Sequence, residues 1–201
     1  MTEFNMPDQT EPFEKRGAWV IKHLMIDVAP LEDFQAAGIV GNLGGESGML
    51  PVNERHPLVP GSRGGWSWAQ WTGVRRTEFE AFAGALGLDI SSDEAAYRFL
   101  VEELLGSENR ALQRLRKTKS LDDAVYIFEV AFERPSDPKG GLPSRLRFAR
   151  RALDYYRFNG RVEAPRVATS PLPPPPPLVF PPPPPPFTWW QSLLQALGWT
   201  K

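Results

Sequence analysis

A glutamate in a glycine-rich stretch is the residue best suited to chemistry. Glu46 lies in the string GNLGGESG, residues 41–48, directly after an apolar run at 34–40 whose spacing predicts a buried helix. Because glycines end helices, the string predicts that Glu46 lies at the C-terminal end of that helix. The edge of a core and the negative end of a helix dipole both disfavour a charged carboxyl group. We therefore expect a proton donor of the kind that cleaves glycosidic bonds, although a solvated glutamate beside a helix cap is an equally good interpretation of this string alone.

Three tryptophans follow within six residues, about twenty residues after Glu46. They belong to GGWSWAQWTG, residues 64–73, which is too short and too rich in glycine to be the core of a helix. Flat apolar rings on a loop suit stacking on sugars, so Trp68 and Trp71 are predicted to bind substrate. Core packing is the alternative and is favoured for any one tryptophan, but we do not expect both Trp68 and Trp71 to face the core. Gln70 is predicted to hydrogen-bond an N-acetyl group, because its amide carries both a donor and an acceptor.

Three other side chains complete the candidate site. Ser47 follows the acid directly and could orient its carboxyl group, bind substrate or simply cap the helix. Tyr126 lies on a predicted helix and is expected either to form the far wall of the cleft or to join the core. Glu54 is the only acidic residue in 50–72 and is a possible second acid that holds a water. A solvated surface role fits Glu54 equally well.

The C-terminal part of the predicted domain is rich in charge. Glu133 is expected to pair with Arg134 or another arginine and to hold helices together. Five arginines lie between residues 144 and 158. They could meet the anionic cell wall, or they could form an ordinary solvated face.

Composition excludes several classes of protein. The chain has 201 residues, 41% of them hydrophobic, which is enough for one core, and its net charge of −1 gives no general attraction to nucleic acid. It has no cysteine and two histidines, His23 and His56, which lack a ligand spacing, so we expect no metal and no cofactor. The N-terminus has no signal-peptide pattern, and no run of eighteen apolar residues predicts a membrane span.

The order of the elements predicts a mostly helical domain between a disordered N-terminus at 1–12 and a tail. The second helix is expected to open at Pro30 and to end at the glycines before Glu46. An irregular lobe or short hairpin is expected at 50–72, where turn formers gather. The remaining helices are predicted at 13–28, 73–86, 92–118, 120–133 and, after a turn at GGLPS, 144–158, so that the domain spans 13–159.

The tail divides into two segments. Residues 160–186 are a proline-rich linker, because 13 of the 22 prolines lie between 165 and 186, and they predict an extended polyproline II spacer. Residues 187–201 predict a short amphipathic helix with an apolar face of Trp190, Leu193, Leu194 and Leu197. This helix has little positive charge, so docking on a protein partner is favoured over a membrane surface. A scaffold that SH3-like domains recruit through the proline strings is a further interpretation.

Four strings in this order resemble the phage tail lysozyme family. They are AAGIVGNLGGESGM (36–49), GGWSWAQWTGVRR (64–76), FLVEEL (99–104) and FEVAFERP (128–135), and the resemblance covers about 13–158. It implies an α+β, mostly helical, lysozyme-like fold with a small β-hairpin lobe. It also implies that Glu46 is the general acid that cuts the β-1,4 bond between N-acetylmuramic acid and N-acetylglucosamine, with Gln70 and Trp71 lining the cleft. The chain departs from the family at 66–68, where WSW precedes AQW.

The resemblance and the tail together predict a peptidoglycan muramidase without cofactor. The tail would hold the enzyme on a phage tail or another protein partner, so that it acts on the cell wall from the virion or after release from the cytoplasm. Three alternatives remain at this point. The domain could be a lytic transglycosylase, in which a muramyl hydroxyl replaces water; it could be an endolysin; or it could be a non-catalytic peptidoglycan-binding module.

Overall fold

The computed structural model describes residues 4–54, 57, 61–134 and 138–159, all within one compact unit, Met1–Ala164. The mostly helical class is confirmed, whereas the predicted linker at 160–186 and helix at 187–201 lie outside the described residues. The elements are α1 (Phe13–Asp27), α2 (Asp33–Ser47), α3 (Gly73–Ala85), α4 (Asp93–Leu105), α5 (Asn109–Leu115), α6 (Leu121–Phe128), the π-helix η1 (Glu129–Glu133) and α7 (Pro138–Asn159).

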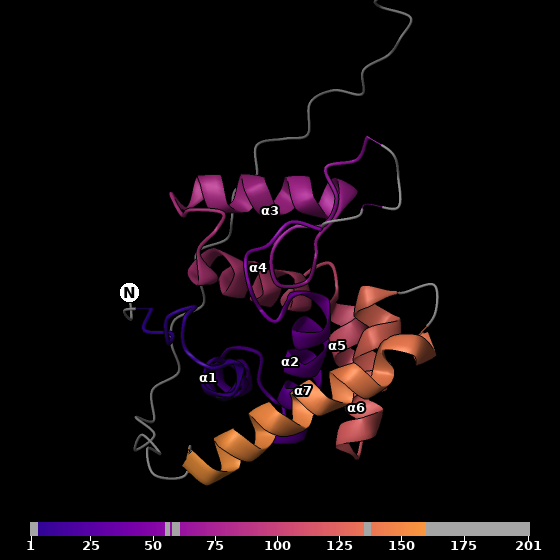
Figure 1. Ribbon diagram of the computed structural model, residues 1–201. Coiled ribbons are helices and arrows are strands. Elements are labelled where there is room, and N and C mark those ends of the chain that lie inside the picture. Colours follow the sequence, from indigo (N-terminus) through magenta and orange to yellow (C-terminus); the bar gives the residue numbers. More distant parts are fainter. Residues whose placement is uncertain (1–3, 55–56, 58–60, 135–137, 160–201) are drawn as a thin grey trace, which may run out of the picture. The chain divides into compact units, whose positions relative to one another are not determined.

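Helix α2 is the centre of the arrangement. It contacts α1, α6 and α7, and it passes through the middle of the helical group in Figure 1. A capping box starts it, because the Glu32 backbone N–H donates to Oε1 of Gln35 at 3.0 Å while the Glu32 side chain accepts from the backbone of Gln35. The helix therefore begins at Asp33, and the prediction that Pro30 opens it is wrong.

The glycines of α2 are contact residues between helices. A Cβ atom at Gly41 would lie 2.6 Å from Cβ of Ala149 and 2.6 Å from the carbonyl oxygen of Arg145, both on α7. The glycines thus let α7 approach closely, and burial along the helix outweighs their poor helix propensity. The prediction that these glycines end the helix is wrong, because α2 continues to Ser47 and stops at Gly48, which has a left-handed φ of 67°.

Three other helix boundaries differ from the prediction. The segment 92–118 is two helices, α4 and α5, separated at Gly106. The segment 120–133 begins as α6, with the Ser120 side chain accepting from the Asp123 backbone N–H at 3.1 Å, and then widens into η1. The last helix begins at Pro138 and contains GGLPS, which was predicted to be a turn.

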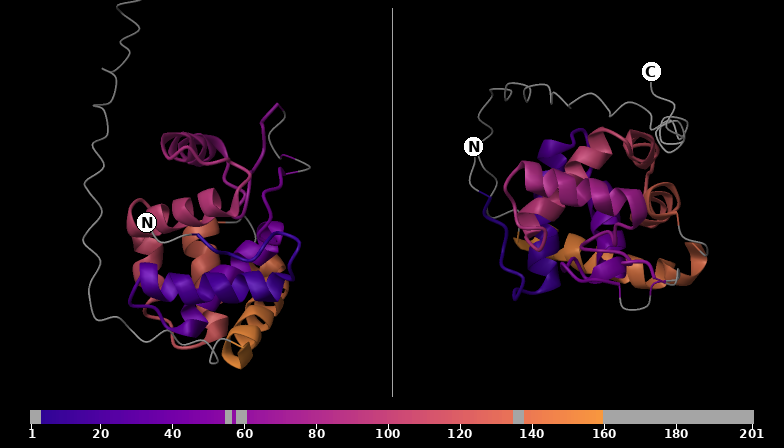
Figure 2. Two further views of the ribbon diagram at one scale, coloured as in Figure 1. Left: turned by 90° about the vertical axis from the view of Figure 1, so that its left-hand side faces the viewer. Right: turned by 90° about the horizontal axis from the view of Figure 1, so that it is seen from above.

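The segment after α2 forms what we call the loop lobe, residues 48–72, described except for 55–56 and 58–60. Its described residues contain no strand, only two isolated antiparallel bridges, Asn53 with Trp66 and Trp66 with Trp71. The predicted β-hairpin is therefore not supported, although a rudimentary hairpin-like pairing is present. In Figure 2, left, the lobe lies beside α3 and α4, apart from the long helix α7.

Buried aromatic and charged contacts attach the lobe to the helices. The Trp71 ring stacks on Phe79 at 4.9 Å and meets Phe99 edge-on at 5.1 Å. Arg16 is buried and donates to Oδ1 of Asp93 at 2.9 Å and to the Met49 carbonyl at 2.7 Å. A charge buried in this way is stable only with such partners, so the contacts fix the lobe to α1 and α4.

Residues 4–12 were expected to be disordered, yet Phe4 packs on Trp19 at 4.9 Å between ring centroids. Of the helices that the structure describes, none combines the length and the apolar character needed to cross a bilayer.

Candidate active site

Glu46 lies where the sequence predicted, in the last turn of α2. The turn ends at Gly48, whose backbone N–H donates to the carbonyl of Gly44. The Glu46 side chain is partly exposed, with 23% of its surface accessible, so it reaches solvent at the edge of the core. This position allows contact with a bound ligand.

The partner of Glu46 is an arginine that the sequence analysis did not single out. Nη2 of Arg145 on α7 donates to Oε1 of Glu46, and Nη1 of the same guanidinium lies 3.2 Å from Oε1 of Glu129. Both Arg145 and Glu129 are buried. The guanidinium of Arg145 therefore connects α2 to η1 next to the predicted acid.

The path of the Arg145 side chain is cleared by two glycines. A Cβ atom at Gly45 of α2 would lie 2.7 Å from Cγ of Arg145, and one at Gly141 of α7 would lie 1.7 Å from Nη1. Any side chain at either position would displace the arginine. GNLGGESG thus contributes space for the partner of Glu46 as well as the glutamate itself.

Glu133 is the carboxyl group with the most perturbed pKa. Burial raises the pKa of Glu133 well above its ordinary value, and the negative charge of Glu46 raises it further, while Arg75 and Arg145 act in the opposite direction. Among the described residues, nothing hydrogen-bonds the buried Oε1 of Glu133. Of the predicted partners, Arg134 is excluded, because its Nη2 donates to Oε2 of Glu108, whereas two other arginines, Arg75 and Arg145, interact electrostatically with Glu133.

The π-helix explains how these carboxyl groups come together. The Arg134 backbone N–H donates to the Glu129 carbonyl at 2.9 Å, five residues back, and Arg134 adopts a left-handed φ of 53°. π-helices and left-handed non-glycine residues are both costly and are concentrated at functional sites. No residue spacing in the sequence announced this widened turn.

A second ion pair borders this group. Arg75 donates to both carboxylate oxygens of Glu103, from Nε at 2.7 Å and from Nη2 at 2.9 Å. The Trp71 indole N–H also donates to Glu103, at 2.7 Å. The guanidinium of Arg75 lies 4.5 Å from the centroid of the Phe132 ring in η1. These contacts attach the loop lobe to α4 and η1.

The two tryptophans predicted to bind sugar have structural contacts instead. Trp68 is completely buried and Trp71 is 1% exposed, so the expectation that both do not face inward is wrong. The Trp68 indole N–H donates to Asp93 at 3.1 Å, and its carbonyl accepts from Oγ of Ser47 at 2.9 Å. Buried rings offer no face for stacking on a ligand, and the aromatic types alone did not distinguish the two roles.

Gln70 and Tyr126 lie in different environments. Nε2 of Gln70 donates to the carbonyls of Val52 at 3.0 Å and Ser67 at 2.8 Å, and Gln70 has a left-handed φ of 48°. Its amide N–H groups therefore hold the turn of the lobe, which leaves the carbonyl oxygen as its acceptor. Tyr126 on α6 is 39% exposed. A role of either residue in substrate binding remains a prediction.

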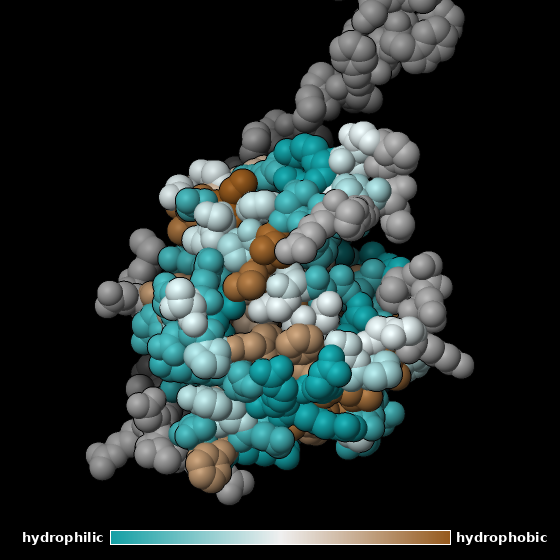
Figure 3. Space-filling view, in the orientation of Figure 1, coloured by the Kyte–Doolittle hydropathy of each residue, from teal (hydrophilic) through white to brown (hydrophobic). Residues whose placement is uncertain are grey.

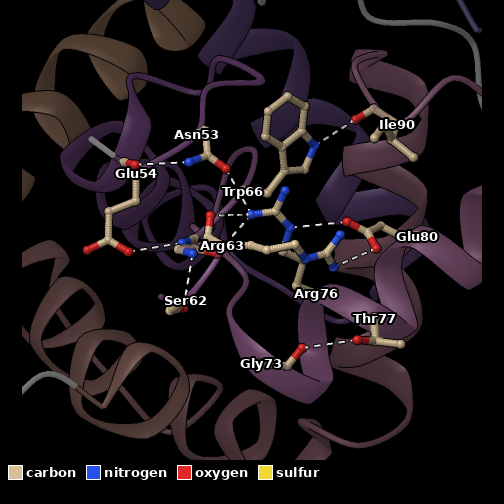
Figure 4. A network of polar contacts seen from close by, with 12 residues as sticks. Asn53, Glu54, Ser62, Arg63, Trp66, Gly73, Arg76, Thr77, Glu80 and Ile90 are labelled. Carbon is tan, nitrogen blue, oxygen red and sulfur yellow. Dashed lines mark hydrogen bonds and ion pairs between the residues drawn. The ribbon is translucent and has the colours of Figure 1, made fainter. Parts of the chain in front are cut away.

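Figure 4 shows the contacts around Glu54, the possible second acid. Oε2 of Glu54 accepts from the Gly65 backbone N–H at 2.9 Å, which stabilises the crossing of the lobe segments. Nη1 of Arg76 donates to the carbonyls of Arg63 and Gly64 from the centre of the same network. The structure thus gives Glu54 a contact within the lobe, and a catalytic role for it remains a prediction.

The surface near these elements is largely polar. Figure 3 shows an indentation with hydrophilic walls on the right-hand side of this face, between the lobe above and α7 below. Within the described parts of the chain, no three His, Cys, Asp or Glu side chains are grouped as a metal site requires. The carboxyl groups beside Arg145 are of a type that can take part in proton transfer.

One family model matches a long part of the chain. Residues 29–156 match the model of the phage tail lysozyme family, a match that runs from before α2 to within α7 and covers more than half of the chain. The match begins later than the predicted resemblance, which started at residue 13. No curated protein matches the chain at a significant level. Peptidoglycan-cleaving, lysozyme-like activity goes with the matched family. The chain belongs to the phage tail lysozyme family.

Proposed function

We propose that this domain is a muramidase that cleaves the β-1,4 bond between N-acetylmuramic acid and N-acetylglucosamine, with Glu46 as the general acid. The observation that carries the proposal is the position of Glu46, partly exposed at the end of α2 and joined to a buried arginine, in a chain of this family. A carboxyl group at that edge can reach a glycosidic oxygen and donate a proton to it.

The loop lobe would form the opposite side of the substrate site. Ser47 joins the end of α2 to the lobe through the Trp68 carbonyl, so the acid and the lobe are held in fixed relation. The carbonyl oxygen of Gln70 is available to accept from an N-acetyl N–H group. In this proposal the buried tryptophans support the lobe, and polar groups on its surface contact the glycan.

Replacing Glu46 by Gln tests the assignment in the full chain. Loss of a general acid lowers the rate by about 10²–10⁴-fold, so clearing of a peptidoglycan suspension should stop while binding to sedimented walls persists. Glu102→Gln is the matched control, because Glu102 is exposed on α4 and should keep its activity. Full clearing by Glu46→Gln would refute the assignment, and a wild-type chain that binds walls without clearing them would indicate a non-catalytic module.

The reaction product decides between hydrolysis and transglycosylation. Water as nucleophile leaves a reducing muramic acid end, whereas the muramyl 6-hydroxyl leaves an anhydro end. Mass spectrometry of digested sacculi separates the two by the mass of one water. We expect the reducing end, and a product mixture of anhydro ends alone would reassign the domain as a lytic transglycosylase.

We further propose that residues 165–201 attach the enzyme to a phage tail. The sequence supports this with a proline-rich spacer followed by an amphipathic segment. A chain without residues 165–201 should still clear walls in solution but should no longer be retained on phage particles. Undiminished retention of the shortened chain would contradict this attachment.

A further inference from the structure

Two carboxyl groups at the candidate site share the guanidinium of Arg145, and a third interacts with it electrostatically. We call Glu46, Glu129 and Glu133 the carboxyl cluster; Arg145 contacts the first two directly. Glu133 lies four residues after Glu129 on η1, about one turn of a π-helix, and it interacts electrostatically with both Glu46 and Arg145. One positive charge cannot balance three negative ones in a buried setting, so at least one carboxyl group of the cluster is expected to hold a proton.

The surroundings identify Glu133 as the group that holds it. Burial and the charge of Glu46 raise the pKa of Glu133 well above its usual range. Charged groups on four neighbouring elements act on this carboxyl group: Glu46 on α2, Arg75 on α3, Glu103 on α4 and Arg145 on α7. Arg145 is also paired with Glu129 of η1, and Arg134 with Glu108. Because Arg75 is already held by Glu103 and Arg145 by Glu46 and Glu129, neither arginine is committed to Glu133.

The ion pair at Glu46 raises a question about the proposed mechanism. A carboxylate paired with arginine has no proton to give, whereas general-acid catalysis needs one on the carboxyl group that faces the sugar. Two buried polar atoms at this site lack hydrogen-bond partners among the described residues. They are Nε of Arg145 and Oε1 of Glu133. Such unsatisfied atoms are costly, and they would be satisfied if the guanidinium changed its partner.

We propose that Glu133 is the proton reservoir of the site. It protonates Glu46 while Arg145 leaves Glu46 and pairs with Glu133. This inference rests on the proposed function of Glu46. The Glu133 carboxylic acid loses its proton and the Glu46 carboxylate gains it, so the charge of the site does not change. Arg145 then neutralises the new carboxylate at Glu133. Glu46 donates its proton to the departing glycosidic oxygen, and the attacking water releases a proton to solvent. Uptake of a proton from solvent then restores Glu133.

Two glycines leave the path of the Arg145 side chain clear. The side chain runs between Gly45 and Gly141, where no Cβ atom obstructs the guanidinium. Its Nη1 atom already reaches η1 at Glu129, so a shift toward Glu133 follows the same helix. In this scheme Glu133 acts through Glu46, to which it supplies the proton, and does not itself touch the substrate.

The test is the pH dependence of kcat for Glu133→Gln in the full chain. The neutral amide imitates the protonated acid in shape but cannot release a proton, so Glu46 must then be protonated from solvent. We expect the alkaline limb of the profile to move to lower pH by about one unit, which is a tenfold loss on that limb, with KM unchanged. Glu133→Asp should restore part of the limb, because it keeps a titrating carboxyl group.

Two controls separate the possible outcomes. Glu108→Gln, a buried glutamate paired with Arg134, should keep the wild-type profile. If Glu133→Gln keeps it too, the reservoir is refuted while Glu46 remains the acid; if Glu46→Gln is fully active, the proposed function itself fails.

An infrared measurement on the wild-type chain does not depend on the folding of any variant. We expect the carbonyl absorption of a protonated carboxylic acid to be present at neutral pH, where ordinary carboxyl groups are ionised. Its absence would overturn the proposal. An isotope-edited spectrum of Glu133→Asp identifies the protonated group. If Glu133 carries the proton, the carbonyl band of the acid should shift when aspartate replaces glutamate.

Discussion

Substitution of Gly41 by alanine tests whether close packing of α2 against α7 determines the site. The new Cβ atom would meet the Ala149 methyl group and the Arg145 carbonyl oxygen, each at 2.6 Å. Neither atom belongs to a flexible side chain, so the helices must separate. Overpacking of a rigid core costs roughly 1–3 kcal/mol, and here we expect the upper end of that range. Alanine is favoured over glycine in a helix by roughly 1 kcal/mol, which leaves a net destabilisation of about 2 kcal/mol.

The assay is urea and thermal unfolding, with activity measured beside it. A loss of about 2 kcal/mol in a domain of this size lowers Tm by about 4–8 °C. The matched control is Gly84→Ala in α3, where the added Cβ atom would meet nothing within 4 Å, and which should stabilise the domain by up to about 1 kcal/mol. Activity of Gly41→Ala should also fall, because Arg145 moves with α7.

Two outcomes of the unfolding and activity measurements would contradict this prediction. If Gly41→Ala and Gly84→Ala unfold within about 0.5 kcal/mol of each other, the two positions are equivalent and contact between the helices does not explain the glycine. If Gly41→Ala is destabilised but fully active, the packing argument stands and the coupling of α7 to the acid fails.

Three further predictions concern buried polar groups. Arg16→Met leaves the Asp93 carboxyl group without its buried guanidinium and should cost about 3–5 kcal/mol in urea unfolding; a loss below about 1 kcal/mol would contradict the anchoring role. Trp71→Phe keeps the ring stack but removes the donor to Glu103, so it should cost about 1–3 kcal/mol, whereas a sugar platform would lose wall binding without losing stability. The raised pKa of Glu133 means that, above the usual glutamate range, the folded chain holds a proton that the unfolded chain releases, so stability should fall with rising pH until the folded pKa is reached, by up to about 1.4 kcal/mol per pH unit. Glu133→Gln should remove that slope above the usual glutamate range, and a slope equal to wild type would show that other groups cause it.

The sequence predicted well those features that depend on local pattern. The helix starts predicted at 92 and 120 are confirmed, because the Ser92 and Ser120 side chains accept from backbone N–H groups three residues on, at 3.1 Å each. The helical class and the location of Glu46 at a helix end also follow from hydrophobic spacing and a terminal glycine. Each of these features is determined by residues close together in the chain.

The errors arose where distant contacts decide the structure. Glycines inside α2 looked like a helix end because their propensity is poor, but α6 and α7 pack directly against them. Trp68 and Trp71 looked like surface platforms because the segment is rich in glycine, yet both are buried, and Phe79 of α3 and Phe99 of α4 pack on Trp71. A short window of sequence does not contain the neighbours that settle either question.

Arg145 shows the same limit at the candidate site. It lies 99 residues after Glu46, among several arginines that the sequence analysis assigned to a solvated face or to the cell wall. Charge pattern alone did not separate the one inward-facing arginine from the others. The π-helix was equally invisible, because no local pattern of residues distinguished Glu129–Glu133 from a continuation of α6.

The widened turn at η1 makes this region sensitive to chain length. A π-turn holds about one residue more than an α-turn, so deleting one residue from 129–133 would let α6 continue with regular α-geometry. Every later side chain of that helix would rotate by about 100° around its axis. The carboxyl group opposite the end of α2 would then come from a different sequence position. A homologue that lacks the extra residue must either show a one-residue gap here in a sequence alignment or use different residues to transfer the proton.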